Sequence, residues 1–307
     1  MMASLSHKVR TAMDESRMLI LGAQVLLGFQ FRAPFEPMFA SLPRTSQYLT
    51  LVALGLSLIS IALIMSPGAY HRIVWQGNDS KDIHDFTTRV MDIALLPFLI
   101  ALSIEFYAVI GKLAGTTGGM LGGVFIGASA LSFWYGPAIT RQRNQTRTKN
   151  RAGNKMKSTP LEDRIEQVLT EARVVLPGVQ ALLGFQLATM LMQGFDSLPQ
   201  SSKYIHLISL LLIGLCVVLL MTPAAYHRIV DRGEDTESFH RIASALLLLA
   251  MVPLPLGIGG EFFVALRKIS GSVSVSVVST VLLLGFFYGL WFAFPTFRRT
   301  QMTRARQ

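Results

Sequence analysis

Long apolar runs are the feature that most constrains the fold of this chain. The run from Leu51 to Met65, LVALGLSLISIALIM, would be apolar on every side of a helix, whereas a helix in a soluble core keeps a polar face. About 20 such residues cross the roughly 30 Å hydrocarbon core of a bilayer. Eight runs of this kind predict membrane spans, at about 18–40, 48–66, 90–111, 116–138, 174–195, 204–222, 243–266 and 274–297. We therefore expect an all-α integral membrane protein.

Composition supports the same class. Only 15% of the residues are charged and the mean hydropathy is +0.46, whereas a soluble domain carries about 25% charged residues. Cys216 is the only cysteine, so no intrachain disulfide can form. The first 17 residues are polar and the first apolar run is long enough to span, so no cleavable signal peptide is expected.

The net charge of +10 could indicate nucleic-acid binding, but its placement indicates membrane topology instead. With the N-terminus in the cytoplasm, the inside segments hold 22 of the 28 Lys and Arg residues and the outside loops hold five. This bias is the positive-inside rule for an even number of spans, and it predicts that both termini are cytoplasmic. Trp75, Trp134 and Trp291 fall at the predicted cytoplasmic ends, where we expect them in the headgroup layer.

The most basic stretch, RQRNQTRTKNRAGNKMK, covers residues 141–157. It predicts a flexible cytoplasmic linker, bounded at 141–161, that lies against anionic lipid headgroups. The linker separates two units, one at 1–140 and one at 162–307, and no nucleic-acid partner is expected.

The two units are copies of one another. Residues 20–115 align without a gap with 176–271 at a constant offset of 156, with 34 identities in 96 positions. PGAYHRIV at 67–74 returns as PAAYHRIV at 223–230, and LLGFQ at 26–30 returns at 182–186. Each unit has four predicted spans, and because four is even both copies enter the membrane in the same direction. We expect parallel repeats related by a pseudo-two-fold axis along the membrane normal, and a homo-oligomer is a further option.

The repeated unit resembles an uncharacterised family of small bacterial membrane proteins with four helices. Its motifs are E-x-R-V, then Q-x-L-L-G-F, then P-x-A-Y-H-R-I after the second span, and the second copy carries them at 171–174, 180–185 and 223–229. The first copy has Met18 where Val174 stands in the second, and Gly68 where Ala224 stands. The resemblance implies a bacterial inner-membrane protein. Some family members are labelled sodium/proton antiporters, so the resemblance implies cation and proton transport as one possible activity.

The repeated octamer allows two interpretations. Ser66-Pro67 and Thr222-Pro223 suit an N-cap and first helical position, so a short new helical turn is expected there. In one interpretation the octamer anchors the chain at the interface, with Tyr in the aromatic belt and Arg on lipid phosphate. In the other it joins a cytoplasmic polar cluster that gates a proton or binds an anion. The candidate cluster is Glu15, Arg17, His71, Arg72, His84, Glu171, Arg173, His227, Arg228 and His240.

Polar residues inside the spans are a second group of candidates. Glu105 and Glu261 occur in both copies but lie about two turns from the outer end, so they are expected to snorkel toward the headgroups. An antiporter needs an acid near the midplane, and no such acid is present in both halves. Glutamine must find a partner helix or a wet cavity in hydrocarbon, and helix-to-helix hydrogen bonding is the simpler account. The intramembrane glutamines are Gln24, Gln30, Gln180 and Gln186.

The fourth span is rich in glycine at a four-residue rhythm. Small residues at this spacing let helix backbones approach closely, so the stretch predicts a packing face and not a nucleotide loop. These residues are Gly118, Gly119, Gly122, Gly123 and Gly127.

No catalytic motif is found, so the protein is expected not to be an enzyme, and no cofactor or resident metal is predicted. A metal site from His71, Asp79 and His84 has no compact ligand spacing. Two functions remain open: transport of an ion or small solute, including cation/proton antiport, and a structural or sensory role in which the basic cytoplasmic face binds anionic lipid or a partner protein.

Overall fold

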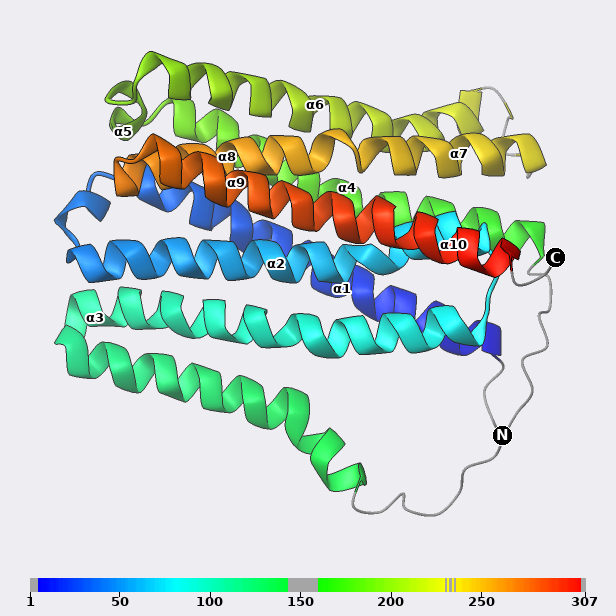
Figure 1. The fold of residues 1–307 in the computed structure, drawn as a ribbon, viewed down its shortest axis with the longest axis horizontal. Helices are drawn as coiled ribbons and strands as arrows, with labels where there is room; N and C mark the ends of the chain where they lie inside the picture. The colour runs from blue at the N-terminus through cyan, green and yellow to red at the C-terminus, as the bar shows by residue number, and fades with distance from the viewer. Residues whose placement is uncertain (1–4, 143–159, 230, 232–233, 235, 305–307) are drawn as a thin grey trace.

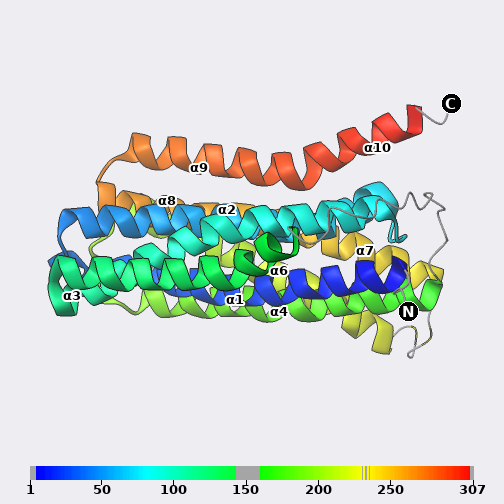
Figure 2. The same cartoon turned by 90° about the horizontal axis from the view of Figure 1, so that it is seen from below.

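The computed structural model describes residues 5–142, 160–229, 231, 234 and 236–304. These residues form an elongated bundle of long helices that lie side by side, with no strand among them (Figures 1 and 2). The first and last described residues, Leu5 and Arg304, lie at the same end of the bundle, which we call the terminal end. The opposite end, where the chain turns at residues 33–43, 115 and 271, we call the hairpin end.

The first repeat contains three helices. Helix α1 (Leu5–Arg32) leads through the short 3-10 helices η1 (Ala33–Phe35) and η2 (Phe39–Ser41) into α2 (Arg44–Trp75). Helix α3 (Lys81–Gln142) folds back on itself at Gly115, whose φ of 72° lies in the region that only glycine adopts readily (Figure 1). The two arms of α3 therefore form a hairpin.

The second repeat has α4 (Leu161–Met190), α5 (Gln193–Asp196), α6 (Gln200–Ile229), α7 (Glu237–Ala250) and α8 (Pro253–Ser270). It ends with α9 (Val273–Tyr288), the π-helical turn η3 (Gly289–Ala293) and α10 (Phe294–Arg304). Gly271, the counterpart of Gly115, has a φ of 70° at the turn between α8 and α9. A glycine with positive φ thus makes the turn in both copies, although ψ differs, at 178° for Gly115 and −4° for Gly271.

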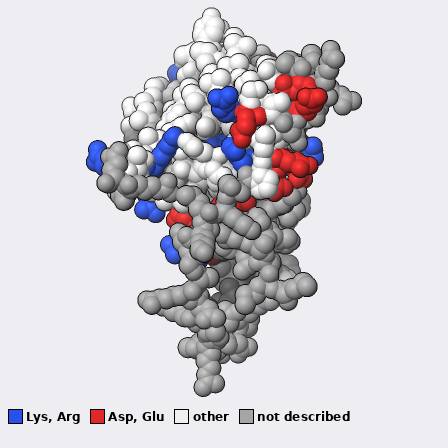
Figure 3. Space-filling model, turned by 90° about the vertical axis from the view of Figure 1, so that its right-hand side faces the viewer, with Lys and Arg blue, Asp and Glu red and all other residues white. Residues whose placement is uncertain are grey.

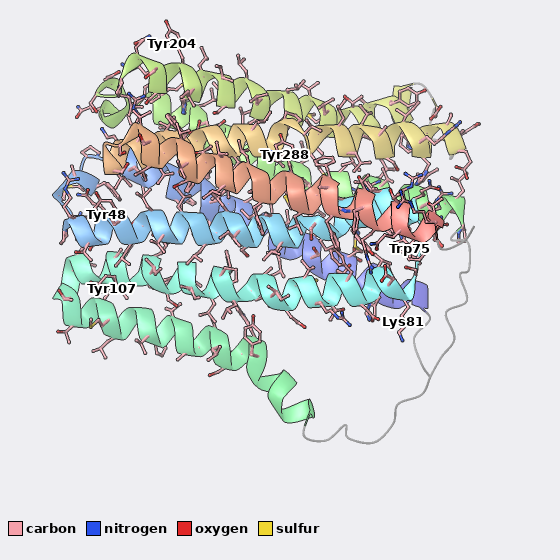
Figure 4. The ribbon with its side chains drawn as sticks, viewed as in Figure 1. Tyr48, Trp75, Lys81, Tyr107, Tyr204 and Tyr288 are labelled. Atoms are coloured by element: carbon pink, nitrogen blue, oxygen red, sulfur yellow. The ribbon has the colours of Figure 1, made fainter. Side chains whose placement is uncertain are left out.

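Seven helices in the described residues are long and apolar enough to cross a membrane, and the longest, Lys81–Tyr135, contains the fold at Gly115. These lengths are compatible with a multi-pass membrane protein. Tyr48, Tyr107 and Tyr204 lie at the hairpin end (Figure 4), as expected of an aromatic belt at a membrane surface. Trp75 lies at the terminal end, but it is buried, and its indole N–H donates to Asp82 Oδ2 at 3.3 Å, so the prediction that it lies in the headgroup layer was wrong.

Two predicted helix boundaries were wrong. The first span was expected to reach residue 40, but α1 ends at Arg32 because Pro34 disfavours helical backbone in the preceding residue. No new helix starts at Ser66: α2 runs through Pro67 without a break. Proline leaves the carbonyl of Leu63 without its helical donor, and the Ser66 hydroxyl donates to that carbonyl at 2.8 Å.

Trp291 was predicted at the headgroup layer, and this was also wrong. Its side chain is 0% exposed, and its indole N–H donates to the carbonyl of Ala62 in α2 at 2.7 Å. The π-helical turn η3 directs the ring into the bundle. Trp291 therefore fastens the end of the second repeat onto the first.

The glycines of the predicted packing face lie where the two arms of α3 meet. A Cβ at Gly119 would lie 2.7 Å from the carbonyl oxygen of Tyr107, and one at Gly123 would lie 2.8 Å from that of Ser103. The glycines thus bring the two arms of α3 together. The predicted basic linker falls almost wholly on 143–159, outside the described residues.

Candidate functional site

A buried ion pair joins the two repeats near the terminal end. Arg72, in the repeated octamer of α2, donates one hydrogen bond to the carboxylate of Glu171 in α4 and another to Ser244 Oγ in α7, at 3.1 Å. A Cβ at Gly68 would collide with the Glu171 carboxylate, so glycine makes room for it. Gly68 differs between the copies, because the second copy has Ala224 at this position.

Arg17 adds a second cation to this site. Its guanidinium is buried and donates to Asp14 Oδ1 at 2.5 Å and to the backbone carbonyl of Gln167 in α4 at 3.0 Å. His71 is buried beside the same group and interacts electrostatically with Arg17, Arg72 and Glu171. Two guanidinium groups and one carboxylate, contributed by both repeats, are therefore held out of water together. We call Arg17, His71, Arg72 and Glu171 the interface cluster.

A cavity of about 30 Å³ opens beside the interface cluster. Arg17, Glu171 and Ser16 are its polar lining residues, and the remaining lining is apolar and comes from α1, α2, α4, α6, α7 and α8. This is room for about one to two water molecules. The cavity is thus a small, mostly apolar space between the repeats with charge at one side.

The same cavity borders a break in a long helix. The helix is interrupted between α7 and α8, at Met251 and Val252, just before Pro253 and Pro255, although both residues keep right-handed helical backbone angles. In the first copy the second of these prolines is replaced by Leu99, and α3 continues unbroken. The Tyr288 hydroxyl of α9 donates to the carbonyl of Val252, between α7 and α8, at 2.6 Å.

A second buried polar group lies toward the hairpin end. Nδ1 of His206 in α6 lies 2.9 Å from Oε1 of Glu261 in α8, and Nε2 lies 3.2 Å from the carbonyl of Gln186 in α4. Both His206 and Glu261 are buried, so the expectation that Glu261 snorkels to the headgroups was wrong. In the first copy, Gln30 donates to Glu105 Oε1 at 3.2 Å. A second cavity, of about 10 Å³, borders Gln186 and Glu261.

Gln24 lies between these two cavities. On α1 it stands one turn from Ile20, which lines the first cavity, and one turn from Gly28, which lines the second. Its side chain is buried, its oxygen lies against Gly178 of α4, and neither of its polar atoms has a hydrogen-bond partner within the described part of the chain. Its counterpart Gln180 is exposed on α4.

The remaining candidates lie apart from the interface cluster. His240 is buried and contacts Arg164 at 3.1 Å, and His227 packs against the ring of Phe239 with centroids 4.5 Å apart. Arg173 is exposed and His84 is half-buried. The side chains of Glu15 and Arg228, the sequence counterparts of Glu171 and Arg72, lie outside the described part of the structure.

The terminal end presents mixed charge. Lys and Arg lie beside Asp and Glu on the described part of this face (Figure 3), and one exposed pair joins Arg164 to Glu237 at 3.2 Å. Among the described residues, no three His, Cys, Asp or Glu side chains gather as metal ligands would, and His71 Nε2 lies 4.0 Å from Asp79 Oδ1.

Sequence reasoning missed His206 altogether. It lies within a long apolar span where the first copy has Thr50, so the difference between the copies was its only signal. Ser244 was missed as well, because a single serine in an apolar helix carries no pattern.

The fold and site define an all-helical, membrane-compatible protein whose polar groups gather between two copies of one unit. The chain belongs to a family of unknown function, DUF6328, whose model matches it twice in tandem, at residues 4–137 and 157–295. The duplication and the resemblance to an uncharacterised family are thereby confirmed. No significant match is found among curated proteins or among solved structures.

Proposed function

We propose that the protein is an eight-span bacterial inner-membrane transporter of an ion or small solute, with cation/proton antiport as the specific form to test first. The observation that carries this proposal is the interface cluster: charges from both repeats line a cavity at a break in a membrane helix. Ionisable groups inside a membrane are costly and usually mark substrate or proton pathways, and broken helices are common at transporter binding sites.

The eight spans follow from counting the two arms of α3 separately, because Gly115 reverses the chain at the hairpin end. The two four-helix repeats are then parallel, and both termini lie on the cytoplasmic side by the positive-inside rule. In this orientation the interface cluster faces the cytoplasm and the His206–Glu261 pair faces outward. The two cavities with Gln24 between them support a pathway along α1 and α4.

Topology can be measured by cysteine labelling in a Cys216→Ser background. Cysteines at Thr45 and Gln200, both exposed at the hairpin end, should react with an impermeant maleimide from outside the cell. Cysteines at Lys81 and Gln301, exposed at the terminal end, should react only in inverted vesicles. Labelling of Lys81→Cys from outside would contradict the orientation, and labelling of Thr45→Cys and Lys81→Cys from one side would contradict the span count.

Transport can be measured in proteoliposomes that carry a pH-sensitive dye, with Na⁺ or K⁺ added outside. We expect cation-dependent proton movement that falls about tenfold or more in Glu171→Gln and in Glu261→Gln, because each loses a buried carboxylate. Glu36→Gln is the matched control, since Glu36 forms a half-exposed pair with Arg32 at 2.8 Å. Equal flux in all three variants would place any transport pathway elsewhere.

The alternative is a structural or sensory protein whose basic cytoplasmic face binds anionic lipid or a partner protein. It predicts no flux of any ion in the same proteoliposomes. It also predicts binding of the full-length protein in nanodiscs to anionic lipid, lost when the basic residues of 141–157 are replaced by Gln. We further expect no enzymatic activity and no bound cofactor.

A further inference from the structure

Several contacts between the two repeats have no reciprocal within the chain. They join residues of α1 and α2 in the first repeat to residues of α4, α8 and η3 in the second. Four such contacts are Gln24 against Gly178, Gly28 against Phe185, Gly55 against Phe262, and Ala62 against Trp291. We call Gln24, Gly28, Gly55 and Ala62 the receiving face, and Gly178, Phe185, Phe262 and Trp291 the covering face.

A two-fold axis between the repeats would require each contact to occur twice within the chain. Gln24 contacts Gly178, so a two-fold axis would also place Gln180 against Gly22. However, Gln180 is exposed, and a Cβ at Gly22 would meet nothing within 4 Å. The reciprocal of Gly28 against Phe185 is Gly184 against Phe29. A Cβ at Gly184 also meets nothing, and Phe29 packs on the Phe185 ring, with centroids 4.4 Å apart, but is still 54% exposed.

Helices α2 and α6 also differ in the exposure of corresponding residues. Ala62, on the receiving face, is 0% exposed, whereas its counterpart Val218 on α6 is 61% exposed. On the covering side, Phe287 of α9 is 0% exposed, whereas its counterpart Leu131 on α3 is 50% exposed. The second repeat therefore carries an open receiving face, and the first repeat carries an open covering face.

An interface made of two different faces is heterologous, and such interfaces build closed rings when the rotation between units permits closure. Here the two faces left open on one chain are the sequence counterparts of the two faces already joined inside it. We propose that a second copy of this chain binds in parallel, so that each open receiving face on α4 and α6 meets the open covering face on α1 and α3 of the other copy. The smallest closed assembly is a dimer containing four repeats.

Lipid is the competing occupant of both faces. Hydrocarbon would fill the spaces above Gly22 and Gly184 poorly, because lipid chains do not reproduce the close packing of a protein side chain over glycine. The internal interface shows what fits there: Gln24 packs its oxygen against the backbone of Gly178, and Phe185 packs over Gly28. The second copy supplies the same pairs, Gln180 with Gly22 and Phe29 with Gly184. This inference stands independently of transport.

The first test is cysteine cross-linking in native membranes, in a Cys216→Ser background. The double variant Gln180→Cys/Gly22→Cys should give a covalent dimer on mild oxidation. The matched pair Gln24→Cys/Gly178→Cys should close within one chain and give none, because that contact is internal. A Gln180→Cys/Gly22→Cys variant that stays monomeric would overturn the proposal. A covalent dimer formed by Gln180→Cys alone would also overturn it, because two receiving faces would then meet.

The second test uses native mass spectrometry of the purified full-length protein. Gly184→Trp should convert the dimer to a monomer with unchanged helix content, because the added ring enters open space in a single chain but blocks Phe29 of the second copy. Gly285→Trp is the control, since Gly285 on α9 is equally open and lies outside both faces. Wild-type protein that is monomeric, or a Gly184→Trp variant that stays dimeric, would overturn the proposal.

Discussion

Arg72 of α2 and Glu171 of α4 form a buried salt bridge across the interface between the repeats, although 99 residues separate them in the chain. Their side chains are 5% and 12% exposed, so the pair is largely withdrawn from solvent. Removal of one partner from a buried pair leaves an uncompensated charge, which costs more than loss of the pair itself.

Replacement of Arg72 by Ala should therefore lower the free energy of unfolding by about 3–5 kcal/mol, and Arg72→Ala/Glu171→Ala should lower it less than Arg72→Ala alone. The measurement is the thermal midpoint of the purified protein in detergent. Arg32→Ala is the control, because Arg32 is half-exposed and should change the stability by less than about 0.5 kcal/mol. Equal midpoints for Arg72→Ala and Arg32→Ala would contradict the prediction.

Gly68→Ala should destabilise the protein although it installs the residue of the second copy, Ala224. The added methyl group overlaps the Glu171 carboxylate and must displace it, at a cost of about 1–3 kcal/mol. The reverse change in the other copy, Ala224→Gly, meets no such crowding at its exposed position and should cost less. Thermal midpoints of the two variants decide the matter, and a more stable Gly68→Ala protein would show that Glu171 can sit elsewhere at no cost.

The His206–Glu261 pair should be energetically coupled. His206→Thr installs the residue of the first copy, Thr50, and leaves Glu261 buried without its imidazole partner. A double-mutant cycle of His206→Thr with Glu261→Gln should give a coupling free energy of about 1–3 kcal/mol. The same cycle on the distant pair Thr50→Ala and Glu261→Gln supplies the baseline. Additive effects in both cycles would mean that the contact contributes nothing to stability.

Trp291→Phe should separate packing from hydrogen bonding at the end of the second repeat. Phenylalanine keeps most of the buried ring but loses the indole N–H that donates to Ala62, at a cost of about 1 kcal/mol. Trp291→Ala should cost about 3–5 kcal/mol, because it also opens a cavity. Trp134→Ala is the control, since Trp134 is only half-buried beside Phe98. Similar losses for Trp291→Ala and Trp134→Ala would contradict the anchoring role.

Apolar periodicity and the duplication predicted the helical class, the repeat and most of the helices, because span length and identity at a fixed offset are properties of the chain itself. Local chemistry predicted the glycine packing face of α3 for the same reason. The course of α2 through Pro67 could not be predicted, because the hydroxyl of Ser66 that replaces the missing donor can be assigned only when the backbone is known.

The candidate site was predicted only in part. Arg17, His71, Arg72 and Glu171 were singled out as a charged group at one end, but the partner of each arginine depends on how the repeats pack. The burial of Glu261 was misjudged because its partner, His206, comes from another helix. Distance from the end of a span cannot tell a snorkelling carboxylate from one that a neighbouring helix has enclosed.

The single histidine at position 206 has a consequence for the history of the gene. In an assembly of identical four-helix chains, any substitution appears in every subunit at once, including those where it is harmful. After the two copies were joined, a histidine could enter one half while the other kept Thr50, and Gly68 could diverge from Ala224 in the same way. Fusion thus allowed each half to specialise, because selection could then act on one position without changing its twin.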